Sequence, residues 1–156
     1  RRELSGRMVV RITEAVPFAV LDISDSKYLV DKDGAILEPI REGTAIFLPV
    51  IKDIIPSNHK EGYAEALRFI KVLNDRKIGA DVQITGTRPE DIMLKIENIL
   101  IKVGAGDFEK KLERLELVRE EIEKRQMAVE YIDVRFANRI IVKPYKQVEE
   151  LVVRGK

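Results

Sequence analysis

The chain has 156 residues, which suits one domain, or one domain with a piece of another. Its 28 basic and 27 acidic side chains nearly cancel, so it has no long-range positive field of the kind that attracts nucleic acid. The sequence contains no cysteine, which excludes disulfides and thiolate chemistry. No apolar run approaches the roughly 20 residues that span a bilayer.

The sequence opens on Arg1-Arg2-Glu3, without an initiator Met or a signal peptide. We therefore expect a piece of a longer protein, with any membrane anchor or targeting segment upstream of it. A chain without cysteine suits an oxidising compartment as well as a reducing one, so composition leaves the compartment open.

Strands are predicted in the first 40 residues. Residues 8–14 are rich in β-branched side chains, and Pro17 is expected to end this strand because it cannot donate a ladder hydrogen bond. Two further apolar runs, residues 28–30 and 35–37, flank the sequence Asp31-Lys32-Asp33-Gly34. Gly34 can adopt a positive φ without steric cost, so these runs are predicted to form a hairpin.

Two helices are predicted further along the chain. The first begins at a cap formed by Ser57 or Asn58 and runs to about Asn74, because its apolar residues recur at spacings of three and four. The second covers residues 107–126, with Asp107 as its cap. Its exposed face carries the acid-before-base pairs Glu120/Lys124 and Glu121/Arg125, and its apolar stripe is Phe108, Leu112, Leu115, Val118 and Ile122.

Residues 80–104 fit two structures. Apolar residues at helical spacing, together with Thr87, Pro89 and Glu90 at a capping-box spacing, would suit a helix. The same stretch also alternates around a possible turn at Glu97-Asn98. Its many β-branched residues and the closing Gly104 favour a hairpin, so strands are predicted here.

Residues 131–143 are predicted to form one strand. Apolar side chains alternate with Tyr131, Asp133 and Arg135, an Ile140-Ile141-Val142 run follows, and Pro144 ends the pattern. The tail, residues 145–156, is weakly patterned and fits either a frayed helix or disorder.

No set of residues indicates catalysis. His59 is the sole histidine and lies at a predicted helix start, where a surface or capping role is the usual one. Asp31-x-Asp33-Gly34 fails as a calcium loop, because Leu29 and Ile40 stand where carboxylates are required. Glycine-rich phosphate motifs are absent from the sequence. We therefore predict a non-enzymatic binding domain with no catalytic residues, no metal site and no cofactor.

Asp133 and Arg135 lie two residues apart on the predicted strand and so share a face. Such a pair can bind to each other, hold an adjacent helix or contact a partner. A structural pairing is the favoured interpretation, and Gly34 is likewise given a structural role in the hairpin turn.

Five motifs resemble those of one family, the FtsQ/DivIB cell-division proteins. Residues 9–19 resemble its V-x-V-x-E-x-x-P-x-A passage, residues 28–34 its YLVDxDG hairpin, and residues 48–49 its LP ahead of a helix. Gly104 with residues 108–112 is similar to its LG…KL, although Val103 replaces the leucine. Residues 132–139 resemble its IDLRYxNR. Five motifs in the same order over nearly the whole chain are quite specific.

The resemblance implies an extracytoplasmic piece of a single-pass protein of the inner (plasma) membrane, anchored through a segment absent from this chain. Residues 1–21 would be the last strand of a POTRA domain and its linker, residues 22–144 an FtsQ/DivIB-type β domain, and residues 145–156 a C-terminal tail. The expected fold is α+β, a mixed, mainly antiparallel sheet with two main helices packed on it.

The resemblance also implies a scaffold of the divisome, the assembly that forms the septum. It would bind the small bitopic partners FtsB and FtsL and other divisome components, with the final strand of the β domain pairing with FtsB, and no nucleic acid is expected. Substituting Ile141 by Pro is expected to abolish that pairing by removing an N–H. The implied contact residues are Phe136, Asn138, Arg139, Ile140, Ile141 and Val142, with Arg88 nearby.

The run Ile140-Ile141-Val142-Lys143 departs from members that carry small residues and a later aromatic there, which affects side-chain contacts more than backbone pairing. A second function stays open, a POTRA-linked domain that assists assembly or transport of outer-membrane or secreted β-proteins. Several tandem POTRA repeats upstream would favour it over the scaffold. A hydrolase is a third possibility, with only scattered carboxylates behind it.

Overall fold

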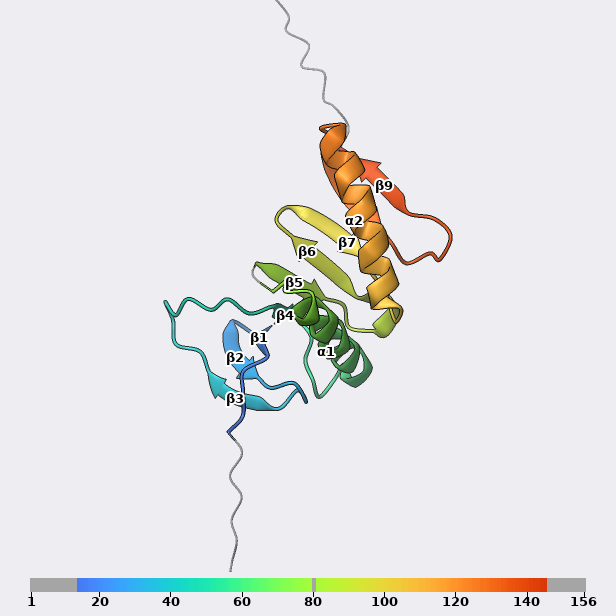
Figure 1. The fold of residues 1–156 in the computed structure, drawn as a ribbon. Helices are drawn as coiled ribbons and strands as arrows, with labels where there is room; N and C mark the ends of the chain where they lie inside the picture. Colours follow the sequence, from blue (N-terminus) through green and yellow to red (C-terminus); the bar gives the residue numbers. More distant parts are fainter. Residues whose placement is uncertain (1–13, 80, 146–156) are drawn as a thin grey trace, which may run out of the picture.

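This computed structural model describes residues 14–79 and 81–145. Within them, one sheet of nine strands forms the frame of the fold, and two long helices cover one of its faces (Figure 1). The strands lie in the order β3-β2-β1-β4-β5-β6-β7-β8-β9 across the sheet. In chain order the elements are β1 (Ala19–Ile23), β2 (Ser26–Val30), β3 (Ile36–Pro39), β4 (Val50–Lys52), α1 (Lys60–Asp75), β5 (Val82–Thr85), the 3-10 turn η1 (Pro89–Asp91), β6 (Met93–Ile96), β7 (Ile99–Lys102), α2 (Phe108–Lys124), β8 (Val129–Asp133) and β9 (Ile141–Pro144).

Most neighbouring strands in the sheet are antiparallel. The pairs β1/β2, β2/β3, β5/β6, β6/β7 and β8/β9 run in opposite directions, whereas β1/β4, β4/β5 and β7/β8 are parallel. Helix α1 connects the parallel strands β4 and β5, and α2 connects β7 and β8. Parallel neighbours need such crossovers, so both helices return over the sheet. The predicted α+β fold is confirmed.

The core lies between the sheet and the two helices. Alternate strand residues such as Ile84, Leu94 and Ile132 are fully buried there, which is what the period of two in a strand provides. The rings of Phe69 from α1 and Phe108 from α2 meet with centroids 4.7 Å apart and join the two helices over the sheet.

The predicted hairpin around Gly34 is confirmed as β2 and β3. Gly34 has a φ of +83°, a conformation that glycine adopts without steric cost. The Tyr63 hydroxyl of α1 donates to the Gly34 carbonyl oxygen at 2.9 Å and so ties the turn to the helix. Burial raises the pKa of Tyr63 to about 12, so this donor keeps its proton well into the alkaline range.

The hairpin favoured for residues 80–104 is also confirmed, as β6 and β7 with Glu97 and Asn98 between them. Glu97 has a φ of +54°. The Pro89 start that suited a helix forms only the short turn η1.

Both predicted helices are confirmed, as is Asp107 as the N-cap residue of α2, whereas the N-cap of α1 is His59 and not Ser57 or Asn58. α1 begins after His59, one residue beyond Asn58, and the His59 ring accepts a hydrogen bond from the Ile55 N–H at 3.1 Å. α2 begins after Asp107, whose φ of +49° is left-handed and whose side chain makes no capping hydrogen bond. The predicted pair Glu121/Arg125 is present at 2.7 Å.

The prediction of one strand over residues 131–143 is wrong. The chain leaves β8 after Asp133, turns at Ala137 and Asn138, and returns antiparallel as β9. Alternating side chains are compatible with a strand, but they do not reveal a turn between two short strands.

Strand β1 was not among the predicted strands. Two predicted segments lie almost entirely outside the described residues. They are residues 8–13 of the strand predicted over residues 8–14, and residues 146–156 of the tail.

Candidate functional site

The strand order leaves β3 and β9 at the two edges of the sheet. Among residues 14–79 and 81–145, β9 has a hydrogen-bonded neighbour on one side only, namely β8. Backbone groups on the open side of an edge strand can pair with another chain. β9 is therefore the candidate site, and it contains two of the expected contact residues, Ile141 and Val142.

Hydrogen bonds at the end of β8 decide which backbone groups of β9 point outward. The Val134 N–H donates to the Lys102 carbonyl oxygen at the end of β7, at 3.0 Å. Because backbone directions alternate along a strand, Asp133, one residue earlier, faces β9 and its register partner Ile141. Val142 follows Ile141 and therefore directs its N–H and C=O away from the sheet.

The other end of β9 gives the same result. The Tyr145 N–H donates to the Ala128 carbonyl oxygen at 3.0 Å, so the backbone of Tyr145 faces inward and that of Pro144 faces outward. Proline has no N–H to offer. The open edge of β9 thus presents both groups of Val142 but only the carbonyl of Pro144.

The side chains of β9 alternate between the two faces of the sheet. Val142 packs against the core on the helix side, across from the fully buried Ile132. Ile141 and Lys143 lie on the opposite face. Ile141 is 38% exposed, and Lys143 forms an ion pair with Glu130 at 2.9 Å.

Asp133 and Arg135 form a two-pronged ion pair where the chain leaves β8. Arg135 donates from Nε to Oδ1 at 3.0 Å and from Nη2 to Oδ2 at 2.7 Å, and its backbone N–H adds a bond at 3.1 Å. Asp133 is only 4% exposed. Hydrogen bonding by Arg135 holds the pKa of the Asp133 carboxyl below its usual value, although burial opposes this. The pairing is present, while its role in stability stays a prediction.

The connection between β8 and β9 carries the remaining expected contact residues. Phe136 is 38% exposed, and the Arg139 guanidinium lies 4.6 Å from its ring centre. Arg114 of α2 donates from Nη2 to the Arg139 carbonyl oxygen at 2.9 Å. This bond fixes the loop beside the helix. Asn138 is exposed at the turn, and Ile140 is half-buried against the core.

Arg88 lies outside β9 and its preceding loop. It precedes η1, between β5 and β6, and forms ion pairs with Asp91 at 2.7 Å and Glu90 at 3.4 Å. Glu90 and Asp91 line the same pocket as Arg135, so this connection lies at the end of the sheet where the chain leaves β8. The other six expected residues lie along β9 and its preceding loop.

Two residues beside β9 were not predicted as part of the site, Arg114 and Pro144. The local sequence of the second helix gives no signal that distinguishes Arg114 from the other charged residues of that helix. Pro144 was expected only to end a strand, whereas its outward position removes one donor from the edge.

The described residues contain no group of three or more His, Cys, Asp or Glu side chains placed to hold a metal ion. In the same part of the chain, neither helix has the length and apolar character needed to cross a bilayer.

Comparisons with known proteins give one family. The family described as cell division protein FtsQ/DivIB, C-terminal, matches residues 19–135. The chain is 30% identical over 155 residues to cell division protein FtsQ of Geotalea daltonii, a match that covers 92% of this chain and 56% of that protein. It is 28% identical to cell division protein FtsQ of Syntrophotalea carbinolica, covering 92% and 55% respectively. The chain thus spans about half the length of the curated relatives it matches.

Proposed function

Because the chain belongs to the FtsQ/DivIB family of cell-division proteins, we propose that it is a non-enzymatic divisome scaffold that binds an FtsB- or FtsL-type partner by strand addition to β9. A role in cell division follows from the family itself. The manner of binding and the identity of the partner belong to the proposal. So does its location, as the extracytoplasmic part of a single-pass membrane protein.

The open edge of β9 is the observation that carries this proposal. Val142 directs an N–H and a C=O away from the sheet, with no neighbouring strand on that side among the described residues. An incoming strand would satisfy both groups and continue the sheet, while its side chains would supply specificity.

The other edge, β3, also contains an outward-facing proline. The Ile40 N–H donates to the Lys27 carbonyl oxygen at 2.8 Å, so the preceding residue, Pro39, occupies an outward position without a donor. The register shifts in both edge pairs, at Leu29/Val30 between β2 and β3 and at Val129/Tyr131 between β8 and β9. Prolines and bulges limit pairing at either edge. The proposal places the partner on β9 because that edge keeps the outward N–H and C=O of Val142 and carries the contact residues that the family resemblance implies.

Side-chain contacts in the proposal come from the β8–β9 loop and from β9 itself. Phe136 offers an exposed ring at the start of this surface, and Ile141 an exposed aliphatic side chain. Asn138, Arg139 and Ile140 lie between them. Arg88 lies in the β5–β6 connection, whose Glu90 and Asp91 line a pocket together with Arg135, beside the start of the β8–β9 loop.

Val142→Pro tests the proposal. The substitution removes the outward N–H and leaves the inward bonds of Ile141 and Lys143 to β8 in place, and a strand position accepts the φ of proline. We expect the variant to fold as the wild type does, by circular dichroism and urea unfolding. Its binding to the FtsB-type partner should fall below detection in a pull-down and by calorimetry.

Ile141→Pro is the matched comparison, and its expected outcome changes from the sequence-based one. The Ile141 N–H faces β8, so this variant loses an internal ladder bond and should be less stable than Val142→Pro. Undiminished partner binding by folded Val142→Pro would refute strand addition to β9.

A further inference from the structure

The flank of α2 that faces β9 carries a basic and an apolar residue. Arg114 marks this flank through its bond to the Arg139 carbonyl oxygen. Val118 follows four residues later and so lies on the same side of the helix. Val118 is half-buried and packs against the edge of the core.

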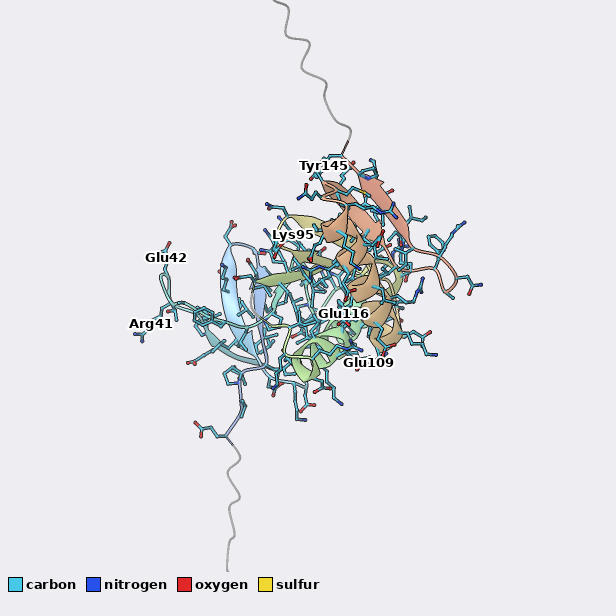
Figure 2. The ribbon with its side chains drawn as sticks, turned by 45° about the horizontal axis from the view of Figure 1, so that its top comes forward. Arg41, Glu42, Lys95, Glu109, Glu116 and Tyr145 are labelled. Carbon is cyan, nitrogen blue, oxygen red and sulfur yellow. The ribbon has the colours of Figure 1, made fainter. Side chains whose placement is uncertain are left out.

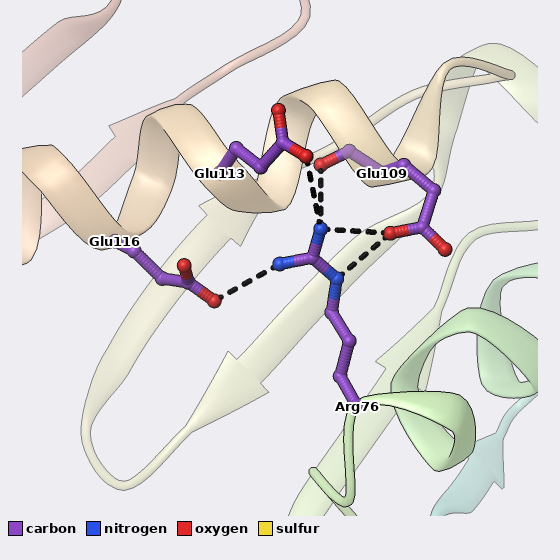
Figure 3. A network of polar contacts seen from close by, with 4 residues as sticks. All are labelled: Arg76, Glu109, Glu113 and Glu116. Carbon is purple, nitrogen blue, oxygen red and sulfur yellow. Dashed lines mark hydrogen bonds and ion pairs between the residues drawn. The ribbon is translucent and has the colours of Figure 1, made fainter.

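The opposite flank of α2 has the opposite charge and is already occupied. Glu109, Glu113 and Glu116 surround the Arg76 guanidinium at 2.8, 3.4 and 3.1 Å, as Figure 3 shows. By contrast, no carboxylate within residues 14–79 and 81–145 forms an ion pair with Arg114 or Arg139. The Arg114 and Arg139 guanidiniums thus have no acidic ion-pair partner in this part of the chain.

The helix and the edge strand also match in direction and spacing. α2 crosses back between the parallel strands β7 and β8, and β9 reverses again, so β9 runs in the same direction as α2 (Figure 1). Four residues of helix advance about 6 Å, and two residues of strand about 6.6 Å. The distance along the helix from Arg114 to Val118 is therefore close to the distance between two residues, i and i+2, on the same face of a strand paired with β9.

We propose, resting on strand addition to β9, that the partner strand carries a carboxylate side chain bound by Arg114 and Arg139. Two residues away on the same face, it carries an apolar side chain that packs on Val118. The carboxylate would be held where the loop enters β9, and the apolar side chain would extend the core beside Val142. Arg135 is not assigned to this role, because Asp133 already occupies its guanidinium.

The order of these two partner residues depends on strand direction. Arg114 lies near the start of β9, and Val118 lies farther along it. A strand antiparallel to β9 meets the apolar position first and the acidic position second. A parallel strand meets them in the reverse order. The recognised pattern is thus apolar-x-acidic or acidic-x-apolar, and the observed order reports the direction of pairing.

Charge reversal at Arg114 is the test, with the full chain and the extracytoplasmic segment of the FtsB-type partner as probe. We expect Arg114→Glu to weaken binding about tenfold at low salt, because attraction becomes repulsion. The difference in affinity between Arg114→Glu and the wild type should become smaller at high salt, because salt screens exposed charges. Changing one acidic residue of the partner to Lys should restore binding to Arg114→Glu.

Two further variants serve as controls. Lys95→Glu makes the same change of charge on β6, at an exposed position on the face away from the helices, and should bind as the wild type does (Figure 2). Arg114→Lys keeps the positive charge and should retain most of the affinity.

The outcomes separate this inference from the function it rests on. If Val142→Pro abolishes binding but Arg114→Glu binds as the wild type does, strand addition stands and the acidic partner residue is refuted. If Arg114→Glu weakens binding and no charge reversal in the partner restores it, Arg114 only holds the Arg139 carbonyl and the inference is wrong. If folded Val142→Pro still binds, both proposals fail.

Discussion

At the scale of single residues, close contacts decide what the side chains beside the site can do. Arg135 bonds to Asp133 through two side-chain nitrogens and its own backbone N–H, so its guanidinium is directed back to the end of β8. Gly104 has a φ of +64°, and a Cβ there would lie 3.1 Å from the Arg135 Cγ. The Arg135 side chain thus passes over a glycine that leaves room for it.

Asp133→Asn should lower the stability of the domain at neutral pH by about 1–2 kcal/mol, because a buried acceptor of charged hydrogen bonds is weakened. The Asp133 pKa is depressed in the folded state. Its contribution is therefore present above the unfolded-state pKa and is lost as pH falls through the folded-state pKa. Urea unfolding should therefore show a smaller difference in unfolding free energy between the wild type and the variant near pH 3 than near pH 7.

Glu120→Gln, at an exposed position of α2, is the control and should have the same unfolding free energy as the wild type at both pH values. If Asp133→Asn lowers the unfolding free energy by the same amount at both pH values, the Asp133–Arg135 pair does not depend on charge.

Gly62 shows a contact that sequence patterns cannot reveal. In the first turn of α1 it lowers helix propensity, and Ala would be the better helix former. A Cβ at this position would nevertheless lie 2.4 Å from the Thr87 carbonyl oxygen. The close approach of α1 to the connection after β5 therefore requires glycine, and this contact outweighs propensity.

At the scale of elements, a charge cluster holds the end of α1 against α2. Arg76 follows the last residue of α1, and its guanidinium reaches three glutamates spaced along one flank of α2 (Figure 3). The Arg76 side chain is 22% exposed, whereas the glutamates are 55–63% exposed. One partly covered cation thus offsets three carboxylates that would otherwise repel one another.

Arg76→Gln should lower the urea midpoint of unfolding, because the glutamates then face each other without a cation. The deficit should be largest at low salt and shrink at high salt, where exposed charges are screened. Glu113→Gln, which removes the longest of the three contacts, should change the midpoint least. An Arg76→Gln deficit that does not depend on salt would show that packing, and not charge, holds the two helices.

At the scale of the whole molecule, both sheet edges carry the same two obstacles to pairing. Both edge strands contain an outward-facing proline, Pro39 in β3 and Pro144 in β9. The register is also shifted in both edge pairs, β2/β3 and β8/β9. Such features limit uncontrolled association of sheet edges, and β9 nevertheless keeps a complete outward pair of groups at Val142.

Pro144→Thr should therefore increase self-association, because it adds a second outward N–H two residues after that of Val142. Sedimentation velocity over a range of concentrations should show more dimer than for the wild type. Pro39→Thr makes the same change at β3 and should also increase association, because a register shift is present in both edge pairs. No increase in dimer for either variant would contradict the role assigned to the edge prolines.

Much of the fold was predictable because the signals are local. The Asp-Gly turn at Gly34, the helical stripe from Phe108 to Ile122 and the alternation around Glu97-Asn98 each depend on neighbours within a few residues. β1 was missed because its Ala19-Val20-Leu21 run has no alternation, and only pairing on both sides makes it a strand. The domain boundaries predicted ahead of residue 22 and after residue 144 stay predictions.

The sequence by itself determined the fold class, the two helices, two of the hairpins and the family, because periodicity, turn chemistry and motif order are all carried by residues close in the chain. Tertiary structure alone decided that residues 131–143 form two strands, that β9 is an edge, and that Val142 rather than Ile141 offers its N–H. It also brought Arg114 to the β8–β9 loop. These features depend on which strand lies beside which, and hydrogen bonds between distant residues fix that order.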